Sequence, residues 1–152
     1  PLLSIQQKIM ELIQDKYWVI FFRRYMVKIA NDVANKCGAL ALVTGESIGQ
    51  VASQTLSNIR VISDVSTLPI IRPLAGLNKE EIINKAKKIN TYKISIEPYE
   101  DCCSFFVPAH PETKARLNDI NNIDDKLDIK KVYKNIITNI EIQKFKYDSK
   151  IN

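Results

Sequence analysis

Residues 42–56 read Leu-Val-Thr-Gly-Glu-Ser-Ile-Gly-Gln-Val-Ala-Ser-Gln-Thr-Leu, and this stretch decides the fold class. An apolar run over 39–43 stops at Thr44 and Gly45, and apolar residues then recur at the spacing of a helix. A strand that ends at a glycine and turns directly into a helix is typical of a nucleotide-binding edge in an α/β sheet. Gly45 lets a ligand approach the backbone, and free N–H groups at a helix start favour an anion. The alternative is an ordinary capped helix after a buried strand, with Ser47 as the cap.

The rest of the chain shows alternating helical and extended patterns. Apolar spacing predicts helices over 4–15, 23–36 and 78–89, and a further helix after residue 126. Extended segments are expected over 17–22, 39–43, 59–62 and 68–72. This order implies a parallel sheet with crossover helices. We divide the chain into a body, 1–125, and a C-terminal helix and tail, 126–152, which packs on the body or on another chain.

The amino-acid composition limits the classes of protein to which the chain can belong. The 152 residues are 45% hydrophobic and 26% charged, as in a modest globular domain or part of one. The net charge of +5 favours polyanions such as RNA only mildly, and on charge alone a solvated lysine-rich surface is the better explanation. No apolar run reaches the ~20 residues of a membrane span, and the start lacks a signal-peptide pattern. Three cysteines, an odd number, argue against a disulfide framework and favour a cytoplasmic location.

Four blocks of sequence carry a resemblance to a known family. They are Phe-Arg-Arg-Tyr-Met over 22–26, Thr-Gly-Glu-Ser-Ile-Gly-Gln-Val-Ala-Ser-Gln-Thr over 44–55, Leu-Pro-Ile-Ile-Arg-Pro-Leu-Ala-Gly-Leu-Asn-Lys-Glu-Glu-Ile over 68–82 and Pro-Tyr-Glu-Asp-Cys-Cys-Ser-Phe-Phe-Val-Pro-Ala-His-Pro over 98–111. Together they resemble the tRNA 4-thiouridine synthases, or tRNA uridine sulfurtransferases, of the PP-loop group of adenine nucleotide α-hydrolases. The third block occurs across that wider group and is less specific.

The resemblance implies a partial PP-loop α/β fold, with a parallel sheet flanked by helices. It also implies a reaction in which ATP and Mg²⁺ adenylate a uridine of tRNA, after which persulfide sulfur from a cysteine desulfurase displaces AMP. Some members also supply sulfur for the thiazole of thiamine. The family's Ser-Gly-Gly-x-Asp-Ser pyrophosphate loop and its N-terminal RNA-binding region do not occur in these residues. We therefore expect the C-terminal part of the catalytic domain, inactive alone, with an open sheet edge that favours homo-oligomers.

Three residues match nucleotide-contacting positions of the family: Arg23, Gly45 and Gln54. We expect Arg23 and Arg24 to open a helix, where the dipole disfavours a cation and so suggests an anionic partner. The alternative is an exposed arginine pair. The amide of Gln54 suits an adenine edge or a ribose hydroxyl, although it equally suits a helix surface.

Three further residues have two interpretations each. Glu46 either acts through magnesium or favours the start of a helix. Arg72 either faces the polyphosphate or ends a strand. His110, in a loop, either contacts RNA phosphate or is exposed to solvent without a functional contact.

The cysteine pair Cys102 and Cys103 matches the catalytic cysteine block of the family. A persulfide carrier needs an accessible thiolate, whereas neighbouring Glu100 and Asp101 would raise the pKa of a thiol. The doubled cysteine leaves the match ambiguous by one residue, with Cys102 favoured by its spacing from Gly45. The alternative is a structural pair of loop cysteines.

Two other functions stay open. Another PP-loop ligase, forming an amide or modifying tRNA, would share the Arg-Pro-Leu block and would not need the cysteines. A non-catalytic nucleotide- or RNA-binding fragment would have a sequence like this one. Cys37, on the apolar face of a predicted helix, is expected to be a core residue.

Overall fold

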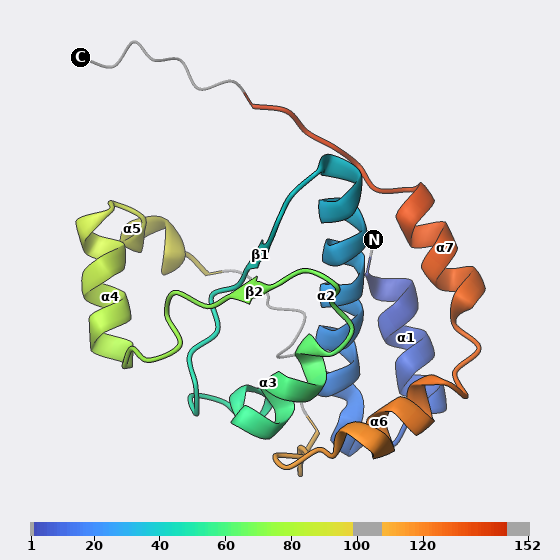
Figure 1. Cartoon of the computed structure of the whole chain (residues 1–152). Helices are drawn as coiled ribbons and strands as arrows, with labels where there is room; N and C mark the ends of the chain where they lie inside the picture. Colours follow the sequence, from blue (N-terminus) through green and yellow to red (C-terminus); the bar gives the residue numbers. More distant parts are fainter. Residues whose placement is uncertain (1, 99–107, 146–152) are drawn as a thin grey trace.

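The long helix α2 (Trp18–Cys37) runs through the centre of the molecule (Figure 1). The computed structural model describes residues 2–98 and 108–145. Bulky side chains near the start of α2 are almost fully buried, namely Ile20, Phe21, Phe22 and Tyr25. Gly38 ends the helix in the left-handed conformation, with φ of 71°, as a glycine at this position is suited to do. The core of the molecule is therefore built around α2.

Four helices pack around α2 and complete the core. They are α1 (Leu3–Leu12), α3 (Leu56–Ser63), α6 (Leu117–Asp124) and α7 (Lys130–Thr138). Their buried side chains are almost all branched aliphatic, including Ile5, Ile9, Val61, Ile62, Ile120 and Ile136. Helix α7 contacts α1 directly, so the predicted C-terminal helix packs on the body of this chain.

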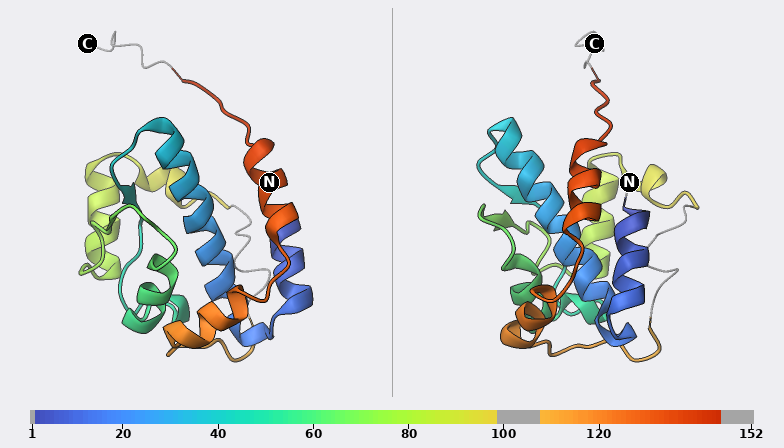
Figure 2. Two further views of the ribbon diagram at one scale, coloured as in Figure 1. Left: turned by 45° about the vertical axis from the view of Figure 1, so that its right-hand side comes forward. Right: turned by 90° about the vertical axis from the view of Figure 1, so that its right-hand side faces the viewer.

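Two short strands, β1 (Leu42–Val43) and β2 (Ile70–Ile71), form a parallel pair. Leu42 pairs with Ile70 and Val43 with Ile71. Figures 1 and 2 show the strands between α2 on one side and α4 (Lys79–Lys88) with α5 (Tyr92–Ser95) on the other. The predicted α/β class, with a parallel sheet flanked by helices, is confirmed.

Asn31 of α2 holds the segment that leads into β2. Its side-chain oxygen accepts hydrogen bonds from the backbone N–H groups of Thr67 (2.9 Å) and Leu68 (3.3 Å). The hydroxyl of Ser66 also donates to it, at 3.1 Å. Because Asn31 is 5% exposed, these bonds form away from water and hold the β2 strand against the central helix.

Three predictions of local structure are wrong. Residues 17–22 are helical, because α2 is buried on several sides at its start and an all-apolar helix start resembles a strand in sequence. Residues 59–62 lie in α3 and are not extended. No helix follows Gly45 directly: residues 44–51 are irregular and lead to the short 3₁₀ helix η2 (Ala52–Gln54).

The start of α3 is capped by Thr55, whose hydroxyl accepts from the backbone N–H of Asn58 at 3.2 Å. Ser47 is therefore not the cap. Its hydroxyl donates to the carbonyl of Leu77 at 2.8 Å and joins the loop after β1 to the loop after β2. The capping box predicted at Asn78 and Glu81 is confirmed at the start of α4.

A second 3₁₀ helix, η1 (Asp15–Tyr17), leads into α2. Among the helices that the structure describes, none combines the length and apolar character needed to cross a bilayer.

Candidate functional site

The carboxylate of Glu46 lies at the centre of a charged cluster in the loop after β1. Its Oε1 accepts from Nη2 of Arg23 at 2.7 Å, and its Oε2 accepts from Nε of Arg72 at 2.6 Å. The hydroxyl of Thr44 donates to the same Oε2 at 3.0 Å. The Glu46 side chain is 4% exposed, so water screens these bonds weakly.

Arg72 forms hydrogen bonds to three parts of the fold: the loop after β1, α3 and β2. Besides Glu46, its guanidinium donates to the hydroxyl of Ser63 on α3 at 2.7 Å and to the carbonyl of Ile70 on β2 at 3.4 Å. This arrangement leaves little of its donor capacity for a ligand. Of the two interpretations of Arg72, its position at the end of β2 is observed, and it holds that end in place.

Arg23 binds the sequence neighbours of the other two candidate residues. Its Nη1 donates to the hydroxyl of Ser53 at 2.9 Å, and Ser53 is the neighbour of Gln54 in η2. Its Nη2 bonds to Glu46, the neighbour of Gly45. The sequence neighbours of Gly45 and Gln54, namely Glu46 and Ser53, therefore bind one guanidinium.

Gly45 and Gln54 leave room for a ligand. A Cβ atom added at Gly45 would meet no protein atom within 4 Å, so the packing of the described residues does not require glycine there. The side chain of Gln54 is half-buried, and within residues 2–98 and 108–145 it has no hydrogen-bond partner. An amide in this situation has donors and acceptors to offer an incoming molecule.

The cluster carries a net positive charge, because two guanidinium groups face one carboxylate. Arg23 is the more open of the two cations, at 22% exposed against 15% for Arg72. A partly exposed guanidinium that is oriented by buried partners suits a phosphate group, which accepts two parallel hydrogen bonds. The arrangement favours an anionic ligand beside Arg23 and the loop after β1.

The described residues form no dedicated magnesium site. Both oxygens of Glu46 accept hydrogen bonds from arginine and threonine donors, and a magnesium role for this side chain stays a prediction. Across the part of the chain that the structure describes, no group of three His, Cys, Asp or Glu residues is placed to hold a metal ion. The expectation that Glu46 favours a helix start is wrong, because residues 44–51 are irregular.

Cys102 and Cys103 lie outside the described residues. Residues 112–115, further along the chain, are hydrogen-bonded to the start of α3. The side chain of Asn58, which is fully buried, donates to the carbonyl of Glu112 at 2.7 Å and accepts from the N–H of Ala115 at 3.1 Å. Thr55 donates to the carbonyl of Thr113 at 2.7 Å. Residues 112–115 are thus fixed to the start of α3, directly after η2.

Arg24 has a different environment from its neighbour Arg23. It is 2% exposed and donates to the carbonyl of Val61, to Asn121 at 2.8 Å and to Asp124 at 3.1 Å. Both arginines lie inside α2, so the predicted cost from a helix start does not arise, and the alternative of an exposed pair is also wrong. Arg24 joins α2 to α3 and α6 and contributes to the fold.

Two other candidate residues are exposed. Cys37 is the last residue of α2 and is exposed, so its predicted place in the core is wrong. His110 is exposed in a loop, as both of its interpretations required.

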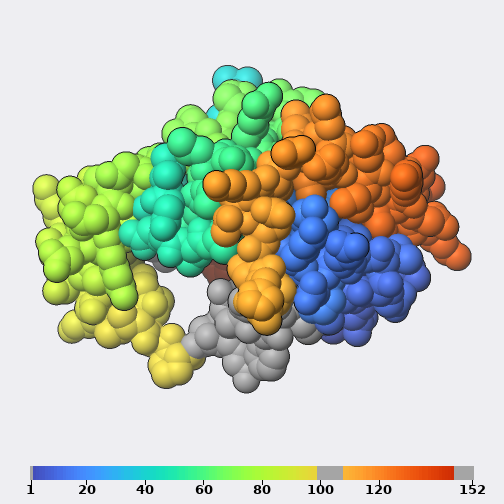
Figure 3. All heavy atoms as spheres, turned by 90° about the horizontal axis from the view of Figure 1, so that it is seen from below, coloured from blue at the N-terminus to red at the C-terminus, as the bar shows by residue number. Residues whose placement is uncertain are grey.

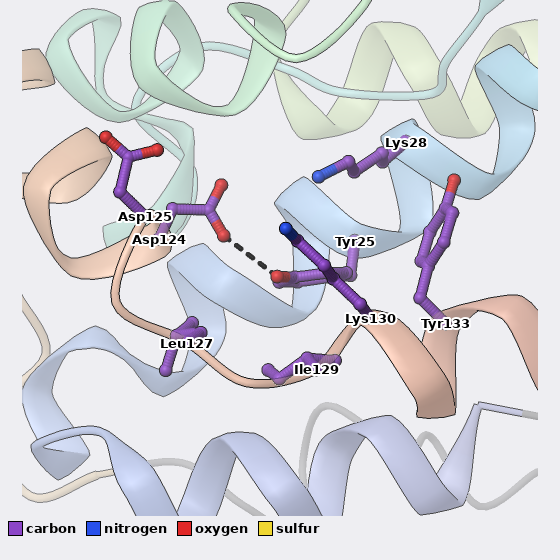
Figure 4. Close-up of a pocket in the computed structure, with 8 residues that line it drawn as sticks. All are labelled: Tyr25, Lys28, Asp124, Asp125, Leu127, Ile129, Lys130 and Tyr133. Atoms are coloured by element: carbon purple, nitrogen blue, oxygen red, sulfur yellow. Dashed lines mark hydrogen bonds between the residues drawn. The ribbon is translucent and has the colours of Figure 1, made fainter.

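A separate pocket of about 250 Å³ lies between α2, α6 and α7 (Figure 4). The phenol of Tyr25 points to Asp124 and donates to it at 2.8 Å, while Tyr133 donates to Asp32 at 2.7 Å. Burial, together with the nearby carboxylate, raises the pKa of each tyrosine well above its ordinary value. Lys28 lies over both rings, at 5.3 and 5.6 Å from their centres. These contacts join α7 to α2, so the side chains around the pocket serve the packing of the helices.

Sequence reasoning missed the two buried asparagines, Asn31 and Asn58. Each occupies a position within an apolar helix face, where an uncharged polar side chain costs free energy unless it is hydrogen-bonded. That mismatch was the available signal, since such a residue usually fixes a neighbouring backbone segment.

Comparison with protein families gives a match over most of the chain. A family model described as thiamine biosynthesis protein (ThiI) matches residues 1–129. A probable tRNA sulfurtransferase of Thermoanaerobacter pseudethanolicus is 48% identical over 84% of this chain and 34% of its own length. One from Acetivibrio thermocellus is 46% identical over 93% of this chain and 36% of its own length. The chain therefore spans about a third of the length of these curated relatives.

A solved structure is similar over the same region. It is a 4-thiouridine synthetase in complex with RNA and bound ATP, 43% identical in sequence, with a TM-score of 0.80. The similarity covers 88% of this chain and 35% of that one. At this identity the likeness concerns sequence as well as fold.

Proposed function

Because the chain belongs to the ThiI family, we propose that it supplies part of the catalytic domain of a tRNA sulfurtransferase. The proposed reaction is ATP-dependent transfer of persulfide sulfur to a uridine of tRNA, which forms 4-thiouridine through an adenylated intermediate. The family's description supports a second role in supplying sulfur for thiamine. The proposal places the protein in the cytoplasm, with 1–125 as the C-terminal part of the catalytic domain and 126–152 as its C-terminal helix and tail.

One observation carries the proposal: Arg23 binds Glu46 and Ser53, the sequence neighbours of Gly45 and Gln54. The structural relative that shares this fold was solved with bound ATP, which supports a nucleotide as the ligand here. Arg23 would hold phosphate oxygens, the backbone at Gly45 would lie against the nucleotide, and Gln54 would hydrogen-bond to its base or ribose.

The residues of this chain have distinct parts in the proposed reaction. Glu46 holds Arg23 and Arg72 in position, so that the guanidinium of Arg23 is oriented before ATP arrives. Bound ATP supplies the adenylyl group that activates the uridine. Cys102 or Cys103 would take part in sulfur delivery, from a segment whose downstream end is held beside η2 by Thr55 and Asn58. A cysteine desulfurase would supply the sulfur, and Mg²⁺ is assigned no ligand in the described residues.

The test is the 4-thiouridine content of tRNA in a strain that lacks its own synthase. The complete reading frame that encodes this chain is introduced, alongside Cys102→Ser, Cys103→Ser and, as the matched control, Cys37→Ser. We expect the wild type and Cys37→Ser to restore the nucleoside, and one of the paired cysteine variants to restore none.

Two results would contradict parts of the proposal. If both paired variants restore 4-thiouridine, the cysteine pair is structural and sulfur follows another route. If a soluble wild type restores none while still binding ATP, the chain belongs to one of the alternatives, a different PP-loop ligase or a non-catalytic nucleotide-binding fragment.

A further inference from the structure

A groove of about 470 Å³ lies between α3 and the segment that leads into α6. Figure 3 shows this face of the molecule, where the orange segment after residue 108 lies against α3. Three cationic side chains line the groove: Arg60 from α3, and Lys114 and Arg116 from the segment before α6. We call these three residues and the space between them the basic groove.

In the part of the chain that the structure describes, the three cations have no partner. Among residues 2–98 and 108–145, none of their side chains takes part in an ion pair or a hydrogen bond. One carboxylate, that of Asp119, also lines the groove, so the lining has an excess of positive charge. Like charges held together without a counter-ion repel one another, and an anionic ligand relieves that repulsion.

The groove is a built feature, because both of its walls are fixed. Asn58 and the N-cap Thr55, of the same helix as Arg60, hold the backbone of residues 112–115 through three hydrogen bonds. Lys114 lies within that fixed segment, and Arg116 stands at the start of α6, where the helix dipole disfavours a cation. The backbone that carries the three cations is thus fixed on both sides of the groove.

We propose that the basic groove binds the phosphodiester backbone of the RNA substrate. This inference rests on the proposed function, since it names a contact for the tRNA. The cations are all exposed, which suits a polyanion held by several weak contacts better than one small anion, for which a buried cation would be needed. The groove also adjoins the start of α3, next to η2 and Gln54, so RNA bound here passes close to the candidate nucleotide site.

The experiment measures tRNA binding to the complete protein by fluorescence anisotropy over a range of salt concentrations. The test variant combines Arg60→Gln, Lys114→Gln and Arg116→Gln. The matched control combines Lys130→Gln, Lys131→Gln and Lys134→Gln, which removes three exposed charges from α7. Both variants therefore have the same net charge, and circular dichroism verifies that both are folded.

We expect the groove variant to bind tRNA about ten-fold more weakly than the control, with a salt slope lower by roughly two to three, because each phosphate contact contributes about 0.7–0.9 to that slope. ATP binding should be the same in both variants. Equal Kd and equal salt slope for the two variants would overturn the inference. A failure of the proposed function would appear separately, as absence of 4-thiouridine formation by a wild type whose tRNA binding still depends on the groove.

Discussion

Arg23 and Glu46 stand 23 positions apart in the sequence, yet Nη2 of the arginine lies 2.7 Å from Oε1 of the glutamate. This contact joins the central helix to the loop that leaves the first strand. Since Glu46 is buried and also binds Arg72, one carboxylate orients two cations from different elements. The candidate site therefore depends on Glu46, although Glu46 itself has no free oxygen to offer a ligand.

Replacing Glu46 by glutamine should destabilise the protein by about 2–3 kcal/mol, because it leaves two guanidinium groups without their shared counter-charge. Urea denaturation of the complete protein measures the loss. Glu97→Gln, which changes an exposed carboxylate after α5, is the control and should alter the free energy of unfolding by less than about 0.5 kcal/mol. Equal stability of the two variants would mean that the charged cluster contributes nothing to the fold.

The adjacent arginines should respond differently to the same substitution. Arg23→Lys cannot engage both Ser53 and Glu46, so we expect the Kd for ATP to rise about ten-fold with little loss of stability. Arg24→Lys removes contacts to Val61, Asn121 and Asp124, so it should lower the melting temperature instead. Calorimetric titration with ATP and thermal unfolding separate the two effects; an unchanged ATP affinity in Arg23→Lys would remove this residue from the site.

A methyl group at Gly45 tests whether a ligand approaches the backbone there. Nothing in the described residues lies within 4 Å of the added atom, so Gly45→Ala should fold normally. The proposed nucleotide contact predicts weaker ATP binding, by about ten-fold if one close backbone contact is lost. Gly76→Ala, at a glycine with equally open space, is the control and should bind ATP as the wild type does.

Alkaline pH should destabilise the protein through Tyr25 and Tyr133. Burial and a neighbouring carboxylate raise the pKa of both phenols above the ordinary value of 10.0, so the folded state keeps its protons when the unfolded state loses them. The stabilising contribution is complete below pH 10.0 and falls as the pH rises toward the folded-state pKa. Urea midpoints measured on either side of this pH give the slope.

The variant Tyr25→Phe removes one of the two raised pKa values. Its stability should decline less steeply with pH than that of the wild type, although it starts lower because the bond to Asp124 is lost. A slope identical to that of the wild type would show that Tyr25 ionises normally in the folded state.

Sequence was sufficient for the parallel α/β arrangement, for the boundaries of α4 and for the Arg23 and Gly45 blocks that the structure places in contact through Glu46. These followed from turn residues, capping chemistry and family motifs, which are local signals. The division of the chain at 125/126 and the roles of Cys102 and Cys103 stay predictions.

Local signals failed where burial decided the structure. The aromatic run before Arg23 favoured a strand by composition, yet it begins a helix that is covered by α1, α3 and η1. The polar loop after Gly45 carried apolar residues at helical spacing, but Ser47 and Glu46 bind partners more than 20 positions away and hold the backbone irregular. Such long-range partners cannot be read from a spacing pattern.

Helix α2 holds both Arg23 and Asn31, and these residues contact the two loops that border the strands. Eight residues of α-helix place them about 12 Å apart along the axis, and one added residue would turn one against the other by about 100°. The distance between the loop after β1 and the segment that enters β2 is thus set by the number of helical turns between Arg23 and Asn31. An insertion or deletion between these two positions would therefore shift the two loops relative to each other, which no single substitution on the exposed face of the helix would do.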